Sequence, residues 1–176
     1  MHGAMQVRKA VEADFDELVA LYQAIGAAVA GTDNDPIWEV GVYPTYEELS
    51  SHIADGEMHV CLMDGRIAGA VVAVSGGEEG YEDVAWRSSV PVAESAVIHL
   101  FGMHPDFKGQ GLARPFMAAV EDALRAQGER ILRLDVVGEN KGAQAVYERL
   151  GFTPCGTAYL AYPDYQGDFA FFEKEL

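Results

Sequence analysis

The sequence predicts one α/β domain, covering residues 1–176, in which a mixed β-sheet of six or seven strands is flanked by about four helices. Three observations lead to this prediction. The length of 176 residues is typical of one domain. Hydrophobic periodicity marks strand-like and helix-like segments along the whole chain. A strand hairpin precedes two strand–helix units, so antiparallel and parallel pairing must coexist in the sheet.

The first strand is expected over residues 5–9, and a helix follows that begins at Asp14. Asp14 is a suitable N-cap, and Glu17 three residues later would complete a capping box. Hydrophobic residues then recur at i, i+3, i+4 and i+7, which places them on one face of the helix. These residues are Leu18, Leu21, Tyr22 and Ile25.

The next segment, residues 30–44, is rich in glycine, proline, Asp and Asn and is therefore expected to form a loop. A second, short helix should begin at Thr45, because Glu48 three residues later completes a capping box. This loop and helix separate the opening strand from the rest of the sheet.

Strands over residues 58–63 and 66–75 should form a hairpin, because Asp64-Gly65 between them is a strong two-residue turn signal. Later in the chain, Gly102 interrupts a strand and indicates a β-bulge that opens the sheet. The second half otherwise alternates strands with helices. Its expected elements are a loop over 75–93, a strand over 96–103, a helix over 112–127, a strand over 131–137, a helix over 140–150, and strands over 152–160 and 169–173.

The chain is strongly acidic, which restricts its partners. The 12 Lys and Arg residues against 28 Asp and Glu residues give a formal charge of −16, so nucleic acid and anionic membranes should be repelled and cationic amines attracted. The same charge could also serve solubility alone. No hydrophobic run is long enough to span a bilayer, and residues 1–5 lack the pattern of a secretion signal. We therefore expect a cytoplasmic protein.

No metal site is expected. Cys61 and Cys155 are far apart and form no CxxC pattern, which argues against a zinc site and against a disulfide scaffold. The histidines show no metal-ligand spacing. Neither cysteine lies in the segments that carry the chemistry described next, so no covalent acyl-enzyme is expected.

One segment of the second half has the features of an anion site. Gly109 and Gly111 allow the backbone to approach a ligand closely, and a helix begins immediately after them. The free N–H groups at a helix N-terminus attract anions. Lys108 and Arg114 add positive charge, while residues 107–116 contain no Asp or Glu. In so acidic a chain, this local reversal of charge indicates a pyrophosphate-binding site.

Three kinds of nucleotide site could use these glycines. A Walker loop requires GxxxxGK[ST], which is absent. A dinucleotide fingerprint needs a small residue where Arg114 stands, because a large side chain prevents close helix–strand packing. A nicotinamide-dependent oxidoreductase thus remains an alternative only if Gly109 and Gly111 are used in another way. The third kind of ligand is acyl-coenzyme A.

Two sequence blocks resemble the GNAT superfamily of N-acetyltransferases. The block KGQGLA, from Lys108 to Ala113, is similar to its [Q/R]xxGx[G/A] pyrophosphate loop, with lysine in the first position. The block from Asn140 to Phe152, with LDV at 134–136 before it, resembles its NxxAxxxYexxGF pattern. Together the blocks cover roughly the second half of the chain, and the first half agrees in layout only. The resemblance implies a GNAT-like fold, in which the strand before the pyrophosphate loop and the next strand separate and the coenzyme enters between them.

The resemblance also implies acetyl-CoA as cosubstrate and suggests which residues bind it. Asn140 would hydrogen-bond the pantetheine arm, although its side chain could instead cap the last helix. Backbone near the end of the preceding strand, at Phe101 and Met103, would lie beside the acetyl-pantetheine, and a nearby amide would polarise the thioester carbonyl. The pyrophosphate loop would comprise Lys108, Gly109, Gln110, Gly111, Leu112, Ala113 and Arg114.

Two residues are candidates for proton transfer. The resemblance implies that Tyr147 protonates the departing thiolate, and the alternative is that Tyr147 only packs in the core. The attacking amine must lose a proton, because alkylammonium groups titrate near ~10. His99 is the titratable side chain within its strand, and an imidazole titrates near ~6.5, so it is the candidate base unless it is a core histidine. Glu94 and Asp135 are the other candidates.

Trp38 and Tyr43 lie where the family places elements that cover the substrate, and they could contact a cationic amine or pack the helices onto the sheet. We therefore predict an acetyl-CoA-dependent N-acetyltransferase that acts on a primary amine of a small molecule in a ternary complex. The alternatives are a protein N-terminus or lysine as acceptor, and a non-catalytic acyl-CoA-binding module. The chain could act alone or as a homodimer.

Overall fold

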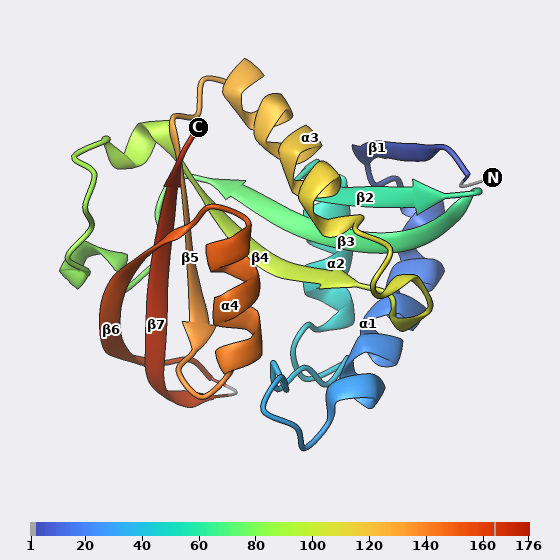
Figure 1. The fold of residues 1–176 in the computed structure, drawn as a ribbon, viewed down its shortest axis with the longest axis horizontal. Helices are drawn as coiled ribbons and strands as arrows, with labels where there is room; N and C mark the ends of the chain where they lie inside the picture. The colour runs from blue at the N-terminus through green and yellow to red at the C-terminus, as the bar shows by residue number, and fades with distance from the viewer. Residues whose placement is uncertain (1–2, 164) are drawn as a thin grey trace.

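The computed structural model describes residues 3–163 and 165–176, and its seven described strands form one mixed sheet (Figure 1). Their order is β1-β2-β3-β4-β5-β7-β6, and among them only β4 and β5 pair in parallel. The strands are β1 (Met5–Lys9), β2 (Met58–Met63), β3 (Arg66–Ser75), β4 (Ser95–Met103), β5 (Ile131–Val137), β6 (Thr153–Ala161) and β7 (Gln166–Glu175). The α-helices are α1 (Phe15–Val29), α2 (Tyr46–Ala54), α3 (Ala113–Ala126) and α4 (Lys141–Arg149). The predicted α/β class, mixed sheet and order of elements are confirmed.

Helices cover both faces of the sheet (Figure 1). On one face, α1 and α2 bury Leu18 and Leu49 completely. On the other face, α3 buries Phe116, and α4 packs beside it. The segment between β3 and β4 covers part of the sheet near β7, where Tyr81 and Phe171 are buried. Cover on both faces explains why β2 and most of β3 are buried without interruption and, apart from His59, carry no polar side chain.

Two local signals in the first half determine the structure as predicted. The Oγ1 atom of Thr45 accepts a hydrogen bond from the N–H of Glu48 at 3.0 Å, and the Glu48 carboxylate accepts one from the N–H of Thr45 at 2.8 Å. Asp64 and Gly65 have φ values of 52° and 79°, as a turn with two left-handed residues requires. The capping box of α2 and the β2–β3 hairpin are thus confirmed.

Asp14 stands at the N-cap position of α1, as predicted, but the predicted capping box is wrong. Asp14 makes no side-chain bond to the helix, because its carboxylate accepts two hydrogen bonds from Arg8 at 2.6 and 2.9 Å. Glu17 accepts a hydrogen bond from the N–H of Ile67 in β3 at 2.7 Å. The side chains of Asp14 and Glu17 therefore bond to residues outside α1 instead of to the first turn of the helix. β7 is also longer than predicted, because its polar first residues, 166–168, pair with β6.

β4 and β5 separate after a short parallel contact, as predicted. They pair only over Ser95–Val97 and Ile131–Arg133, although β4 continues to Met103 and β5 to Val137. Figure 1 shows the two strands diverging from this contact. From Ile98 onward, the edge of β4 that faces β5 has no ladder partner among the described strands. Its backbone polar groups are therefore available for another partner.

The bulge in β4 lies at Leu100, and its prediction at Gly102 is wrong. Between the pairs Ala70–Gly102 and Val72–His99, β4 has one residue more than β3. Leu100 has a φ of 53°, a left-handed conformation that is uncommon for a residue other than glycine. The glycine is thus not the residue that distorts the strand.

Tyr22 and Gly102 act on the two sides of this bulge. The fully buried hydroxyl of Tyr22 donates a hydrogen bond to the carbonyl of Leu100 at 2.8 Å, which holds the left-handed residue in place. A Cβ atom at Gly102 would lie 2.5 Å from Cδ1 of Ile25 and 3.3 Å from the ring of Trp38. Gly102 therefore permits α1 and the following loop to approach the strand closely.

Replacing Tyr22 with phenylalanine is expected to destabilise the fold by about 1–3 kcal/mol, because the carbonyl of Leu100 would lose its buried partner. The free energy of unfolding in urea measures this change. Tyr46→Phe is the matched control, because Tyr46 is 50% exposed. Equal stability of the two variants would show that the Tyr22 hydroxyl does not hold the bulge.

Candidate active site

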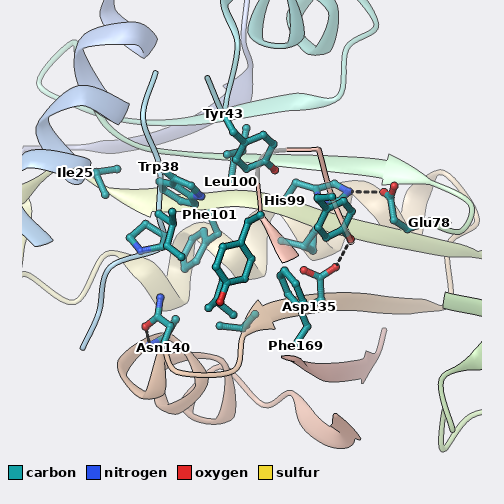
Figure 2. Close-up of a pocket in the computed structure, with 18 of the residues that line it drawn as sticks. Ile25, Trp38, Tyr43, Glu78, His99, Leu100, Phe101, Asp135, Asn140 and Phe169 are labelled. Carbon is teal, nitrogen blue, oxygen red and sulfur yellow. Dashed lines mark hydrogen bonds and ion pairs between the residues drawn. The ribbon is translucent and has the colours of Figure 1, made fainter. Parts of the chain in front are cut away.

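A cavity of about 640 Å³ lies where β4 and β5 diverge (Figure 2). Its other walls come from the loop between α1 and α2, from α2 and the residues after it, from the loop after β3, from the start of α4 and from the β6–β7 hairpin. Its volume is in the range of small-molecule sites. The residues predicted for catalysis or binding that line it are Trp38, Tyr43, His99, Phe101, Asn140 and Tyr147.

Tyr147 lies on α4 between the core and the cavity. Its ring packs against Phe101 and Phe152, with centroids 6.0 and 5.6 Å away. Its hydroxyl forms no hydrogen bond with any described residue. Burial raises the pKa of Tyr147, and the nearby charge of Asp135 raises it further. The phenol therefore stays protonated well above neutral pH and is free to donate its proton into the cavity.

His99 projects from β4 and pairs with a residue that the sequence analysis did not identify. Its Nε2 lies 3.1 Å from a carboxylate oxygen of Glu78, in the loop between β3 and β4 (Figure 2). The hydrogen bond with His99 lowers the pKa of Glu78, so this carboxylate stays ionised. An ionised carboxylate at Nε2 favours the tautomer that carries its proton there and leaves Nδ1 as the basic nitrogen.

Asp135, a second candidate base, extends from β5 toward the same end of the cavity (Figure 2). Its Oδ2 atom accepts hydrogen bonds from the hydroxyls of Tyr81 at 2.8 Å and Tyr162 at 3.1 Å. Burial raises the pKa of Asp135, and these two hydrogen bonds oppose the rise. Glu94, the third candidate, pairs with Arg130 at 2.8 Å and does not line the cavity. His99 is therefore the better placed base.

The predicted pyrophosphate loop is exposed at the start of α3 rather than inside the cavity. Gly109 and Gly111 have φ values of 80° and 74°, and a Cβ atom at either would have no neighbour within 4 Å. The N–H groups of Gly109 and of residues 111–114 donate no hydrogen bond to any described residue. The turn is thus open, and its amides can bind an anion.

The charged side chains around this turn have different environments. The guanidinium of Arg114 donates to the carbonyl of Arg149 at 2.6 Å, so it ties the start of α3 to the end of α4. Lys108 is exposed. The side chain of Gln110 donates to the carbonyl of Asp106 at 3.3 Å. The backbone therefore provides free donors, and the bond to Arg149 restricts the position of the Arg114 guanidinium.

Asn140 caps α4, as one of its two predicted roles requires. Its Oδ1 accepts a hydrogen bond from the N–H of Ala143 at 3.0 Å, and its Nδ2 lies 3.5 Å from the carbonyl of Asn34. A Cβ atom at Gly142 would collide with the side chain of Asn34. The loop between α1 and α2 thus meets the start of α4. One N–H of the Asn140 amide group therefore remains for a ligand.

The predicted aromatic and strand-end residues divide into two groups. Trp38 packs edge-on against Tyr22, with ring centroids 5.5 Å apart, and also lines the cavity, so packing and ligand contact are compatible. Tyr43 lines the cavity as well. Met103 does not, because its sulfur packs close to Gly69 of β3.

Several cavity residues had no distinctive signal in the sequence. Glu78 stands in a loop rich in acidic residues, and nothing in its spacing distinguishes it from its neighbour Glu79. The β6–β7 hairpin brings aromatic side chains from the end of the chain to the cavity. These side chains are Tyr162, Tyr165 and Phe169.

Neither cysteine belongs to this site. Neither Cys61 nor Cys155 lines the cavity, and both thiols are free. Burial raises the pKa of Cys61 to about 11, so it is a poor nucleophile. The described residues contain no group of three or more His, Cys, Asp or Glu side chains placed to hold a metal ion. Among the described helices, none is long and apolar enough to cross a membrane.

Comparison with known proteins gives consistent matches. The sequence profile of the Acetyltransferase (GNAT) family matches residues 28–152. An uncharacterized N-acetyltransferase from Methanocaldococcus jannaschii is 34% identical over 93 residues, which are 53% of this chain and 37% of that protein. A GNAT-family acetyltransferase structure from Streptococcus agalactiae superposes with a TM-score of 0.82 at 22% identity, covering 100% of this chain and 98% of the other. The structure of yncA from Salmonella typhimurium, solved with its cofactor acetyl-CoA, has a TM-score of 0.66 at 19% identity over 98% and 94% of the two chains.

Proposed function

The chain belongs to the acetyltransferase (GNAT) family, and we propose that it transfers the acetyl group of acetyl-CoA to a primary amine of a small molecule. One observation supports this most directly: the cavity between the diverging strands holds His99 and Tyr147, a base and an acid that the reaction needs. The match to the Methanocaldococcus protein covers only 37% of that protein. Support for the proposed activity therefore comes from the residues of this chain's own site.

The residues present fit acetyl-CoA as a substrate. The free N–H groups of Gly109 and of residues 111–114 offer an anion site for the pyrophosphate at the start of a helix. The unpaired edge of β4 from Ile98 to Met103 could hydrogen-bond the amides of the pantetheine arm in place of β5. This edge leads toward the cavity, so the thioester would lie near Tyr147.

Replacing Gly111 with alanine should weaken acetyl-CoA binding by about 10- to 100-fold, the loss of one or two charge-assisted hydrogen bonds. The added methyl group would meet no protein atom within 4 Å, so it would take up space at the open turn, and alanine would be strained at a φ of 74°. Gly128→Ala is the matched control: it lies at the other end of α3, has a φ of 94° and is equally unobstructed.

Both alanine variants should lose about 1–2 kcal/mol of stability from backbone strain. Isothermal titration calorimetry with acetyl-CoA measures the loss of affinity separately from this loss of stability, which both variants share. Equal affinities in the two variants would contradict the proposed pyrophosphate site, whereas weak binding by Gly111→Ala alone supports it.

The proposed mechanism begins with deprotonation of the ammonium group of the acceptor by Nδ1 of His99, directly or through water. Glu78 positions the imidazole and stabilises its protonated form. The neutral amine then attacks the thioester carbonyl and forms a C–N bond. A backbone N–H on the free edge of β4 can stabilise the oxyanion that develops.

Collapse of the tetrahedral intermediate breaks the C–S bond, and the proton of the Tyr147 hydroxyl passes to the departing sulfur. Because the pKa of Tyr147 is raised, the phenol carries its proton at neutral pH, so the proton is present for this transfer. The nitrogen, which became positively charged when the C–N bond formed, releases its second proton to water or to the Tyr147 phenolate, so a neutral amide forms and the phenol is restored. Both cysteines lie away from the cavity, which supports direct transfer between the bound substrates without an acyl-enzyme.

A thiol-release assay with acetyl-CoA tests the proposal. Polyamines, aminoglycosides, amino acids and peptides are the acceptors to compare. Release with small amines supports the proposal, and the cavity of about 640 Å³ favours such acceptors over a protein chain. Release only with peptides would favour the N-terminal or lysine alternative. Tight binding of acetyl-CoA without any release would favour a non-catalytic module.

A further inference from the structure

The end of the cavity beyond His99 is acidic. The described residues that line the cavity include no Lys and no Arg. Its ionisable groups, tyrosines aside, are Glu48, Glu57, Glu78, Asp135, His52 and His99. Four carboxylates therefore face two imidazoles, so carboxylates outnumber cations even when both imidazoles are protonated.

These acidic groups form two positions rather than one. Glu78 and Asp135 lie near His99, where the reacting nitrogen must sit (Figure 2). Glu48 belongs to α2, and Glu57 follows that helix, where its carboxylate lies 2.7 Å from Nδ1 of His52. The second position is therefore on another wall of the same cavity.

Aromatic side chains accompany the carboxylates. Tyr43, Tyr162 and Tyr165 line the cavity, and tyrosine rings attract cations through their faces. The hydroxyl of Tyr162 is already engaged by Asp135, which orients its ring. Carboxylates and aromatic rings together are the surroundings in which alkylammonium groups bind well.

From this arrangement we propose that the acceptor is an aliphatic diamine or polyamine, with a second ammonium group besides the acetylated amine and with no carboxylate or phosphate. This inference rests on the proposed function. The reacting nitrogen is neutral when it attacks, so it cannot neutralise Glu48 and Glu57. A second ammonium group can do so, whereas a carboxylate on the acceptor would meet no cationic side chain among the described lining residues.

Three acceptors of similar length isolate the contribution of the second group: 1,4-diaminobutane, butylamine and 4-aminobutanoate. The diamine should bind about tenfold more tightly than butylamine, the gain from one charge-assisted contact, and 4-aminobutanoate more weakly than either. Calorimetry measures these affinities without requiring turnover. The ratio of kcat/KM values from thiol release should follow the same order.

Replacing both Glu48 and Glu57 with glutamine should bring the affinities for the diamine and for butylamine close to parity. Glutamine can retain the capping box at Glu48, because it accepts the same backbone hydrogen bond. Glu47→Gln is the matched control: Glu47 lies in the same helical turn but does not line the cavity. It should keep the tenfold preference.

The inference is overturned if butylamine binds as well as the diamine, or if the preference survives in the double variant. Release of thiol with peptides or amino acids but not with diamines would overturn it as well, while leaving acetyl transfer intact. Failure of the proposed function looks different: acetyl-CoA would not bind, or would bind without thiol release, whichever amine the calorimeter favours.

Discussion

Replacing Tyr147 with phenylalanine is expected to lower kcat by about 10²- to 10⁴-fold, the usual contribution of a general acid. The departing thiolate would then have to take its proton from water. Binding of acetyl-CoA should persist, because the ring that packs against Phe101 and Phe152 is retained. Stability should also persist, because the hydroxyl has no hydrogen-bond partner among the described residues.

This combination of effects distinguishes catalysis from packing. Single-turnover thiol release and urea denaturation of the same variant measure the two properties. Tyr159→Phe is the control, because Tyr159 is 63% exposed and does not line the cavity. A Tyr147→Phe enzyme with normal kcat would mean that the tyrosine only packs in the core.

Replacing His99 with glutamine is expected to reduce kcat/KM by about 10²- to 10⁴-fold at neutral pH. The loss should shrink by about tenfold for each unit that the pH rises toward ~10, because the free amine itself becomes more abundant. The wild-type enzyme should show a flatter profile, since His99 removes the proton. A profile of the variant parallel to that of the wild type would exclude His99 as the base.

Glu78→Gln gives a graded test of the same pair. The carboxylate has a lowered pKa because it hydrogen-bonds to His99, so it is ionised across the neutral range and stabilises the protonated imidazole. Without that carboxylate, the imidazole loses the group that fixes its orientation and tautomer. We therefore expect kcat/KM to fall, whereas an unchanged kcat/KM would indicate that Glu78 is not the partner in solution.

The parts of the fold that could be predicted are those determined by neighbouring residues. The capping box at Thr45 and the turn at Asp64-Gly65 each depend on residues within a few positions. The separation of β4 from β5 and the open turn at Gly109 followed from the two motif blocks. The second motif block also indicated Asn140 and Tyr147 as site residues, and both line the cavity.

The parts that could not be predicted depend on partners far away in the chain. Asp14 is an ordinary N-cap residue by type, but Arg8 from β1 holds its side chain. The bulge at Leu100 depends on a hydroxyl from Tyr22, 78 residues earlier. Glu78 becomes significant only because its loop folds back over His99. The local sequence of these segments does not indicate such long-range contacts.

The divergence of β4 from β5 has a consequence for how the protein can change over generations. The unpaired edge from Ile98 onward offers peptide groups rather than side chains. Peptide groups are the same for every amino acid except proline, which lacks the N–H. Substitutions along this edge can therefore change the side chains that contact the acceptor without removing the peptide groups that bind the acyl carrier. The specificity for the acceptor can thus evolve while the binding of the carrier is retained.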